Sequence, residues 1–239
     1  MFREDLNQHY HSTFGAIQES RHIFIGAGLK FALASGINSP APECFTGHNP
    51  LASASIRHSL DPLFSQSPIK ILEIGFGSGL NALMTLNETE KQGINLHYTA
   101  VEAFPLDERC WKMLNYAKLL ESIDHPQIFA KLHHAAWNVA EEISPHFILQ
   151  KIHTKLEEFI PDQGAFNLIY FDAFGPDAQP ELWTEKIFRN LWHGMSPGGI
   201  LVTYSVKGTV VRALRSAGFI TEKLPGPPGK RHILRAVKT

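Results

Sequence analysis

A short glycine-rich segment is the first feature of the sequence that indicates chemistry. It reads ILEIGFGSGLN, so that Gly75, Gly77 and Gly79 follow an apolar run and precede residues that can open a helix. Such turns commonly bind nucleotides, but the dinucleotide fingerprint G-x-G-x-x-G needs a third glycine where this chain has Leu80. Glu73, just before the turn, would repel a pyrophosphate, yet it can attract an ammonium or accept a hydrogen bond from a ribose hydroxyl. The segment favours S-adenosyl-L-methionine over a redox dinucleotide, and a plain tight turn is the alternative.

Other polar residues also follow predicted strands. Glu102 follows the apolar residues 96–101 and can accept hydrogen bonds from both ribose hydroxyls of a nucleoside, although it could also be an ordinary exposed carboxylate. Asp172 follows FNLIYF on the turn FDAFGP, and Ser205 follows the apolar residues 199–204. Ligands of parallel sheets bind beyond the carboxyl ends of the strands. We therefore expect these residues and Glu73 to face one common crevice.

Strands and helices alternate along most of the chain. This order predicts an α/β fold with a mainly parallel sheet that is covered on both faces. Two late segments, 220–224 and 231–237, are predicted to form an antiparallel pair. The predicted strands are 69–74, 96–101, 147–153, 166–171 and 199–204, and the predicted helices are 80–90, 105–120, 181–192 and 209–217.

The N-terminal part of the chain has a different character. We expect residues 1–65 to form an extension that packs on a catalytic core of residues 66–239, without a linker between them. In HYHSTFGAIQESRHIFI, the apolar run near Phe24 and a turn at Gly15 indicate a hairpin or short strand pair. The segments NSPAP and Asn49-Pro50 are expected turns, and residues 51–60 could be a helix. Residues 121–146 have the least legible pattern and are interpreted as an insertion.

Composition excludes several classes of protein. The chain has 239 residues, 44% of them hydrophobic, and a formal net charge of −1, so no global positive field indicates a polyanion partner. No apolar run is long enough to cross a bilayer, and no secretory signal is visible, so we expect a cytoplasmic protein without membrane contact. Its two cysteines are too few for a disulfide framework, and no histidines stand at metal-ligand spacing. No metal is predicted.

Charge is unevenly distributed, however. From Lys207 onward, eight Lys and Arg residues face a single acid, Glu222. This basic strip is either an ordinary solvated face or a surface for phosphates. Composition alone does not decide between them.

Several segments together resemble one family. The motifs ESRHIF, ILEIGFGSGLN, VEAFPL, FDAFGPDAQPELWT, TYS, VRALRSAGF and PGPPGKRHILRA occur in the same order as in the methyltransferase domain of the MnmC-like tRNA-modifying enzymes. The resemblance extends from about Tyr10 to Ala236 and is weakest over residues 121–150. VEAFPL and DAFGPDAQPELW are more distinctive than the glycine turn.

The resemblance implies a fold, a cofactor and a substrate. It implies a Rossmann-like class I methyltransferase fold with S-adenosyl-L-methionine as methyl donor. The substrate would be the exocyclic amine of 5-aminomethyl-2-thiouridine at the tRNA wobble position in the anticodon loop. Better-known members carry a second, FAD-dependent domain that prepares this amine. This chain resembles the stand-alone (MnmD-type) form, so we expect an upstream amine-forming enzyme on a separate chain; methylation of another modified uridine is an alternative.

An alkylamine substrate requires an acid in the crevice. An amine with a pKa near 10 is almost entirely protonated at pH 7, so that deprotonation costs about 4 kcal/mol. Asp172 can orient the ammonium and accept its proton, and the family's matching aspartate lies in the active site. Alternatively, Asp172 could do no more than hydrogen-bond the turn or the amine of the cofactor. Asp177 or Glu181 could instead be the carboxylate that binds the substrate. Glu19 matches the family's N-terminal motif and is the second candidate for binding the substrate amine.

Aromatic and basic residues complete the predicted site. Phe76, inside the glycine turn, could line the cofactor, while Phe174 and Trp183 could stack on an extruded base; each could also belong to the core. Lys230 and Arg231, after the stiff PGPPG turn, are the preferred phosphate contacts.

Three other functions stay open at this point. A small-molecule amine methyl- or aminopropyltransferase would share the fold and the acids but would not need the basic strip. A non-catalytic S-adenosyl-L-methionine-binding RNA partner would bind cofactor without turnover. A nicotinamide dehydrogenase is disfavoured by Leu80 and Glu73.

Overall fold

The protein is built around one large mixed sheet. The computed structural model describes residues 2–3, 8–9, 13–35, 67–120 and 125–239. Eight strands run in the order β5-β6-β4-β3-β7-β8-β10-β9. The central five, β6, β4, β3, β7 and β8, are parallel, whereas β5, β10 and β9 are antiparallel to their neighbours. The strands of this sheet are β3 (Ile69–Ile74), β4 (Leu96–Glu102), β5 (Ala140–Ser144), β6 (Phe147–His153), β7 (Phe166–Phe171), β8 (Met195–Thr203), β9 (Phe219–Pro225) and β10 (His232–Lys238), and β1 (Phe2–Arg3) pairs separately with β2 (Gln8–His9).

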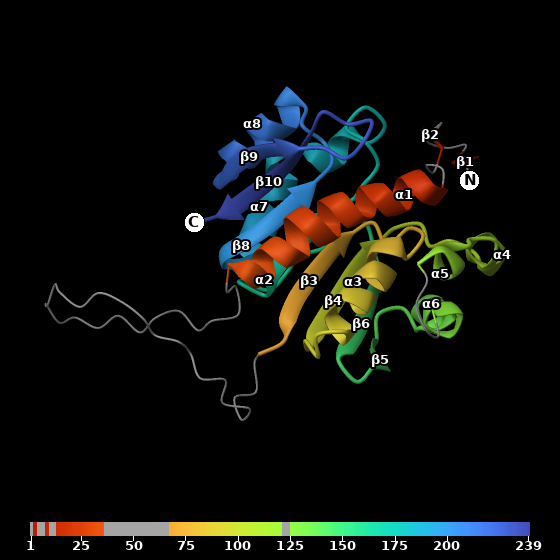
Figure 1. Ribbon diagram of the computed structural model, residues 1–239. Coiled ribbons are helices and arrows are strands. Elements are labelled where there is room, and N and C mark those ends of the chain that lie inside the picture. The colour runs from red at the N-terminus through yellow and green to blue at the C-terminus, as the bar shows by residue number, and fades with distance from the viewer. Residues whose placement is uncertain (1, 4–7, 10–12, 36–66, 121–124) are drawn as a thin grey trace, which may run out of the picture.

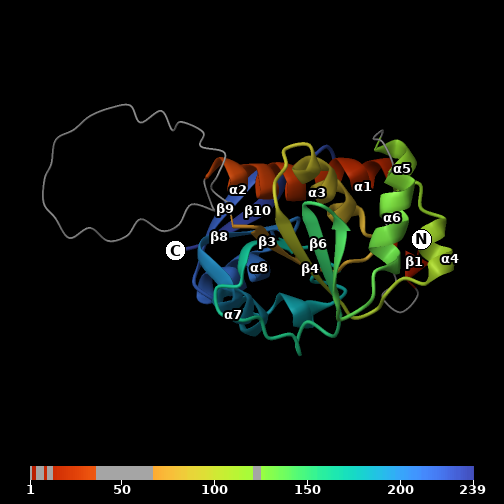
Figure 2. The ribbon, with the colours of Figure 1, turned by 90° about the horizontal axis from the view of Figure 1, so that it is seen from below.

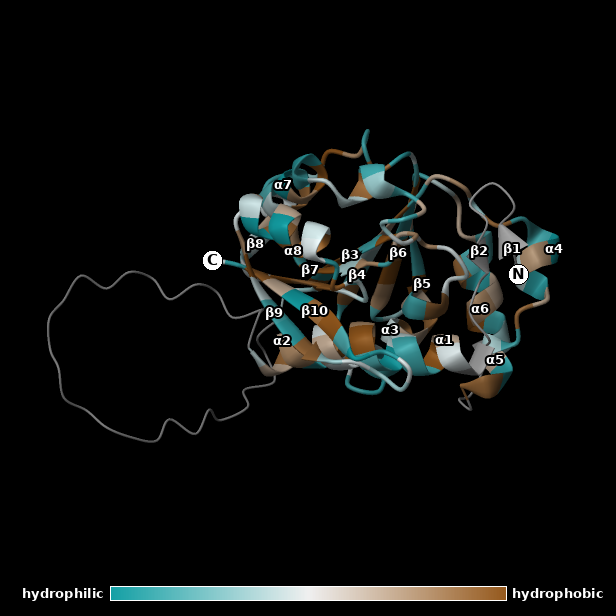
Figure 3. Ribbon diagram, turned by 90° about the horizontal axis from the view of Figure 1, so that it is seen from above, coloured by the Kyte–Doolittle hydropathy of each residue, from teal (hydrophilic) through white to brown (hydrophobic). Residues whose placement is uncertain are grey.

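Helices cover both faces of the large sheet (Figures 1 and 2). One layer contains α3, α6 and the N-terminal helix, which consists of α1, η1 and α2. The other layer contains α7 and α8. Each layer packs on its own apolar cluster, one on either side of the sheet. Figure 3 shows hydrophobic strands inside and hydrophilic residues on the helices around them. The helices are α1 (Thr13–Ser20), η1 (Arg21–Lys30), α2 (Phe31–Ala34), α3 (Leu80–Glu90), α4 (Glu108–Lys112), α5 (Tyr116–Leu119), α6 (His125–His134), η2 (Pro180–Trp183), α7 (Glu185–Gly194) and α8 (Gly208–Ser216).

The α/β prediction is confirmed, element by element, in the core. Strands β3, β6 and β7 and helix α3 have the predicted bounds, and β9 and β10 form the predicted antiparallel pair. Strands β3 and β7 are rich in β-branched and aromatic residues and are buried on both faces over most of their length, as central parallel strands must be. In β3 only Lys70 is exposed. Long buried strands are therefore legible from sequence.

The N-terminal hairpin prediction is wrong for residues 13–34. This segment is one continuous helix composed of α1, the π-helical η1 and α2, with helical dihedral angles at both junctions. The apolar run contributes Ile23, Phe24 and Ile25 to the core beneath the helix. A Cβ on Gly28 would lie 3.0 Å from Val202 Cγ2 and 3.2 Å from Tyr170 Cε1, so glycine lets the helix approach the sheet closely. Tertiary packing overrides the β propensity of the run.

Two other regions differ from the prediction. The expected helix over 105–120 is divided into α4 and α5, and residues 125–146 form α6 and β5, an edge strand of the sheet rather than a separate insertion. The predicted turns at 38–42 and 49–50, the helix over 51–60 and the boundary at residue 65 lie outside the described residues. In the described part of the chain, no helix combines the length and the apolar character that crossing a bilayer requires.

Candidate active site

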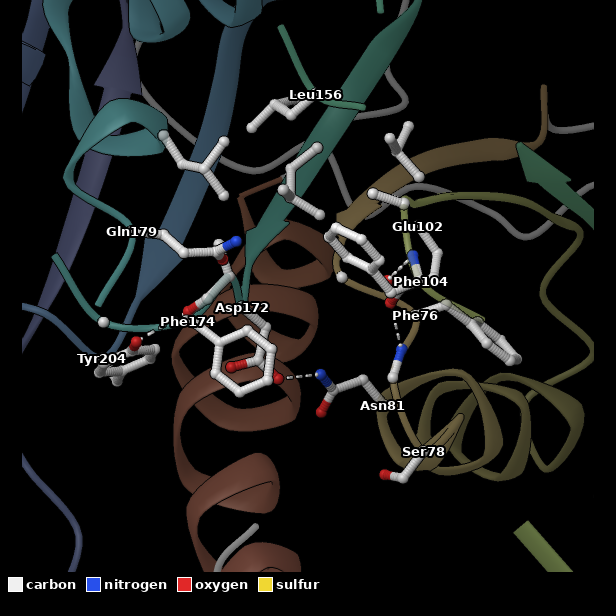
Figure 4. Close-up of a pocket in the computed structure, with 18 of the residues that line it drawn as sticks. Phe76, Ser78, Asn81, Glu102, Phe104, Leu156, Asp172, Phe174, Gln179 and Tyr204 are labelled. Carbon is white, nitrogen blue, oxygen red and sulfur yellow. Dashed lines mark hydrogen bonds between the residues drawn. The ribbon is translucent and has the colours of Figure 1, made fainter. Parts of the chain in front are cut away.

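A pocket of about 790 Å³ opens at the carboxyl ends of the parallel strands. Its wall is formed by the glycine turn after β3, the residues after β4 and β7, and one side of α1 (Figure 4). This is the position at which open α/β sheets bind ligands. The predicted crevice therefore exists, and Glu102 and Asp172 both line it.

The glycine turn has a backbone that only glycine adopts easily. Gly75 has a φ of 90° and Gly79 a φ of 71°. A Cβ on Gly75 would lie 3.1 Å from the Asp172 carbonyl oxygen, and one on Gly79 would lie 3.2 Å from the Phe76 ring. Gly77, with a φ of 50°, completes the turn. The left-handed conformations and the close approach to β7 explain why the three glycines recur in this segment.

Glu102 is held firmly by the main chain. One carboxylate oxygen accepts a hydrogen bond from the Gly77 N–H at 2.9 Å, and the other accepts one from the Phe104 N–H at 2.8 Å. A carboxylate oxygen has two lone pairs and can accept from more than one donor. The carboxylate is thus oriented at the pocket wall by the turn that it faces (Figure 4).

Asp172 and Glu73 share one hydrogen-bond donor. Asn81 Nδ2, in the first turn of α3, lies 2.8 Å from Glu73 Oε1 and 2.9 Å from Asp172 Oδ2. Ser20, at the end of α1, donates from its hydroxyl to Asn81 Oδ1 and fixes the orientation of the amide. Sequence reasoning missed Asn81, because an Asn at the start of a helix suggests only a cap. Its place two residues after Gly79 was the available signal.

The predicted placement of Glu73 on the crevice wall is wrong. Its side chain is fully buried and does not line the pocket. Burial raises the pKa of the Glu73 carboxyl well above its usual value, and the nearby Asp172 raises this pKa further. Within the described chain, Glu73 Oε2 and the Tyr98 hydroxyl are buried oxygens without a hydrogen-bond partner that meets geometric criteria. Glu73 therefore acts on the pocket through Asn81, and its burial favours the protonated, neutral form of the carboxyl.

Asp172 is half-buried on the pocket floor and its protonation is finely balanced. Burial raises the pKa of its carboxyl to about 7, the hydrogen bond from Asn81 opposes this rise, the negative charge of Glu19 adds to it, and Lys230 lowers the pKa. A group that titrates near neutral pH can both accept and release a proton under physiological conditions. The geometry and the pKa together suit the role of a base.

Glu19 reaches the same pocket from α1, where it pairs with a residue far along the chain. Its carboxylate forms an ion pair with Lys230, whose Nζ also lies 4.4 Å from the centre of the Tyr204 ring. All three side chains line the pocket. Lys230 is therefore engaged inside the site rather than displayed as a phosphate contact, which revises its predicted role. Arg231 is exposed and lies outside the pocket lining.

The aromatic predictions divide into two groups. Phe76 and Phe174 line the pocket, as does Phe104, whose side chain is half-exposed. Trp183 does not: it is buried against Phe171 and Phe188, and its indole N–H donates to the Phe174 carbonyl. Its predicted stacking on a base is excluded because the ring belongs to the core.

The other two candidate carboxylates differ in whether they line the pocket. Glu181 lines the pocket. Asp177 does not; its side chain is 82% exposed and pairs with Lys207. Ser205 is buried and does not line the pocket either, contrary to expectation. Among the described residues, no group of three or more His, Cys, Asp or Glu side chains could hold a metal ion.

Known proteins with similar sequences lead to one conclusion. The chain is 30% identical over 241 residues to the tRNA 5-methylaminomethyl-2-thiouridine biosynthesis bifunctional protein MnmC of Leptospira borgpetersenii, and equally identical to that of Magnetococcus marinus. These alignments cover 94% and 96% of this chain and 31% of each relative, so the chain spans about a third of the curated relatives' length.

A family model and a solved structure agree with these relatives. Residues 124–239 match the model described as S-adenosyl-L-methionine-dependent methyltransferase. The fold is similar to the crystal structure of MNMC2 from Aquifex aeolicus, with a TM-score of 0.57 and 21% identity over 70% of this chain and 52% of that one. The predicted class I fold and the resemblance to the MnmC-like methyltransferase domain are thereby confirmed, and the chain is an S-adenosyl-L-methionine-dependent methyltransferase domain.

Proposed function

We propose that this protein methylates the exocyclic amine of 5-aminomethyl-2-thiouridine at the wobble position of tRNA, giving 5-methylaminomethyl-2-thiouridine. The observation that carries the proposal is Asp172: a carboxyl with a pKa of about 7 on the floor of the pocket, held by Asn81. The printed names of the curated relatives describe biosynthesis of this nucleoside. An alkylammonium substrate must lose a proton before it can act as a nucleophile, and a carboxylate beside it can accept that proton.

The pocket fits S-adenosyl-L-methionine on its chemistry. Glu102, oriented by two main-chain N–H groups, is a carboxylate of the kind that accepts hydrogen bonds from ribose hydroxyls, while the glycine turn lets the backbone approach the ligand closely. The acidic residues suit a cofactor that carries an ammonium and a sulfonium and no phosphate. Phe76 and Phe104 offer apolar walls for a nucleoside. When bound, the cofactor supplies an electrophilic methyl group.

Asp172 would make the amine nucleophilic. A substrate ammonium with a pKa near 10 is about six pKa units above an ordinary aspartate but only about three above Asp172, so the raised pKa lowers the cost of proton transfer by about 4 kcal/mol. The lone pair of the neutral amine would then be available to the methyl group that a bound cofactor supplies. The abstracted proton leaves to solvent through Asp172. Glu19 is the second carboxylate that can hold the ammonium before this transfer.

Recognition of tRNA would involve the surface around the pocket mouth. Phe174 can stack on an extruded base, and the exposed Arg231 can contact a phosphate. The amine itself must come from an earlier reaction, which we assign to an upstream amine-forming step of tRNA modification. An anticodon loop presents the splayed bases that such a pocket can admit.

The test is methyl transfer from labelled S-adenosyl-L-methionine to tRNA isolated from a host lacking this gene. Mass spectrometry of the nucleosides should show conversion of the aminomethyl uridine into its methylated form. Unmodified transcripts of the same tRNA, which lack the amine, should receive no methyl group. Equal labelling of both RNAs, or transfer only to free small amines, would overturn the proposal.

A further inference from the structure

The Glu19–Lys230 ion pair stands inside the pocket rather than on the outer surface. Their side chains are 18% and 28% exposed, and both line the cavity whose floor carries Asp172. Lys230 Nζ lies over the Tyr204 ring at 4.4 Å from its centre. Tyr204 is fixed in turn, because its hydroxyl donates to the Ala173 carbonyl at 2.7 Å, one residue after Asp172. An alkylammonium group is thus already held beside the proposed base.

The surroundings of Lys230 Nζ are those that recognise an alkylammonium in general. A carboxylate supplies the counter-charge, an aromatic face supplies a cation–π contact, and a second acid lies close enough for its pKa to respond to both charges. We propose that Lys230 occupies, in the free protein, the site that receives the alkylammonium group of the substrate, and that the substrate displaces it. This inference rests on the proposed function for the identity of that substrate.

The lysine can leave without disturbing the fold. It belongs to the turn between β9 and β10, where the Gly226 N–H donates to the Arg231 carbonyl at 3.1 Å and the Lys230 N–H donates to the Pro227 carbonyl at 2.9 Å. His22 Nε2 lies 2.8 Å from the Pro225 carbonyl oxygen and ties the start of this turn to the N-terminal helix. The backbone is therefore anchored. The lysine's flexible four-carbon stem can move by rotation alone.

Displacement of one cation by another also explains selectivity. Exchange of Lys230 for a substrate ammonium leaves Glu19 paired and the net charge of the pocket unchanged. A neutral ligand, such as a uridine without the amine, would separate the Lys230 cation from the partly buried Glu19 without replacing its charge, and that loss is unfavourable. The ion pair therefore admits substrates that bring their own positive charge.

The test uses n-butylammonium chloride, which matches the lysine side chain, as a probe of the full-length protein by calorimetry. Lys230→Met should bind the probe about tenfold more tightly than the wild type, because the site is vacated while its apolar stem is kept. Lys223→Met is the matched control: this lysine is exposed on β9 outside the pocket, and its loss should leave probe binding unchanged. The double variant Glu19→Gln/Lys230→Met should lose the gain.

Equal probe affinity of the wild type and Lys230→Met, or an undiminished gain in the double variant, would overturn the inference. Lys230→Gln provides a second vacated site, and melting curves of each variant establish that it is folded. The probe needs neither tRNA nor turnover. If the wild type failed to methylate tRNA, the probe result would still decide whether this is an alkylammonium site, so the two proposals fail separately.

Discussion

Replacement of Asp172 by Asn should abolish methyl transfer and yet stabilise the fold at neutral pH. Asparagine has the same shape, and its side-chain oxygen can still accept the hydrogen bond that Asn81 donates at 2.9 Å. It cannot accept the proton of the amine, so we expect the rate of methyl transfer to fall by about 10²- to 10⁴-fold. The gain in stability comes from removing a charge that burial penalises.

The size and sign of that gain follow from the pKa of Asp172. Burial raises this pKa from 3.8 to about 7, so between those values the folded protein binds more protons than the unfolded chain does. The free energy of unfolding of the wild type must then fall as pH rises through this window and must become level above pH 7. From pH 5 to 7 the change is up to about 2.7 kcal/mol at about 1.36 kcal/mol per unit, and partial solvent exposure reduces it to about 1–2 kcal/mol. The Asn variant lacks this loss.

Denaturant unfolding of the two proteins at pH 5, 6, 7 and 8 measures the effect. The stability difference in favour of Asp172→Asn should grow by about 1–2 kcal/mol between pH 5 and 7, which corresponds to roughly 2–8 °C in melting temperature, and should not grow further at pH 8. Asp177→Asn is the control, since this carboxylate is 82% exposed and outside the pocket. A constant difference across the pH range would refute the raised pKa, and unimpaired methyl transfer would refute the role as base.

Other substitutions test other contacts in the same structure. Glu102→Ala should weaken S-adenosyl-L-methionine binding by about 10- to 100-fold in calorimetry, because two main-chain N–H groups lose the acceptor that orients the pocket wall. Unchanged affinity would contradict the placement of Glu102 at the cofactor. Asn81→Leu should destabilise the protein by about 2–4 kcal/mol. It should also move the acid limb of the kcat/KM profile to higher pH, since the hydrogen bond from Asn81 lowers the pKa of Asp172. An acid limb at unchanged pH would show that Asn81 is only structural. Gly28→Ala should cost about 1–3 kcal/mol in denaturant unfolding, because the new methyl group meets Val202 and Tyr170 on the sheet; full stability would mean that the helix can shift freely.

The core of the fold could be predicted because its signals are local. Three elements can each be recognised from about ten consecutive residues. They are the apolar strand β3, the turn that needs glycines and the helix that starts at Leu80. The acids at strand ends follow from topology, since parallel strands deliver their carboxyl ends to one edge. Glu102 and Asp172 were therefore placed correctly at the pocket.

The incorrect predictions share a different cause. Each concerns a side chain or segment whose position depends on what packs above or below it in the folded protein. Glu73 is on the same strand as predicted, but its side chain points into the sheet-helix interface and is fully buried. Trp183 follows the turn that carries Asp172, as predicted, but its side chain points into the core. The run near Phe24 has strand propensity, and only the sheet surface beneath it makes a helix the better packed solution. No spacing rule along one segment contains that information.

The N-terminal helix links these failures to function. In the proposed function, the Rossmann-like core holds the nucleoside with its glycine turn and Glu102, but it contributes only Asp172 of the two acids that we propose for the amine. The other, Glu19, and the hydroxyl that orients Asn81, from Ser20, are consecutive residues at the end of α1. Glu19 meets Lys230 across 211 positions of sequence. This part of the site is therefore assembled from segments far apart in the chain, and we expect the close packing of the N-terminal helix on the sheet, rather than the cofactor motif, to determine which substrate the pocket accepts.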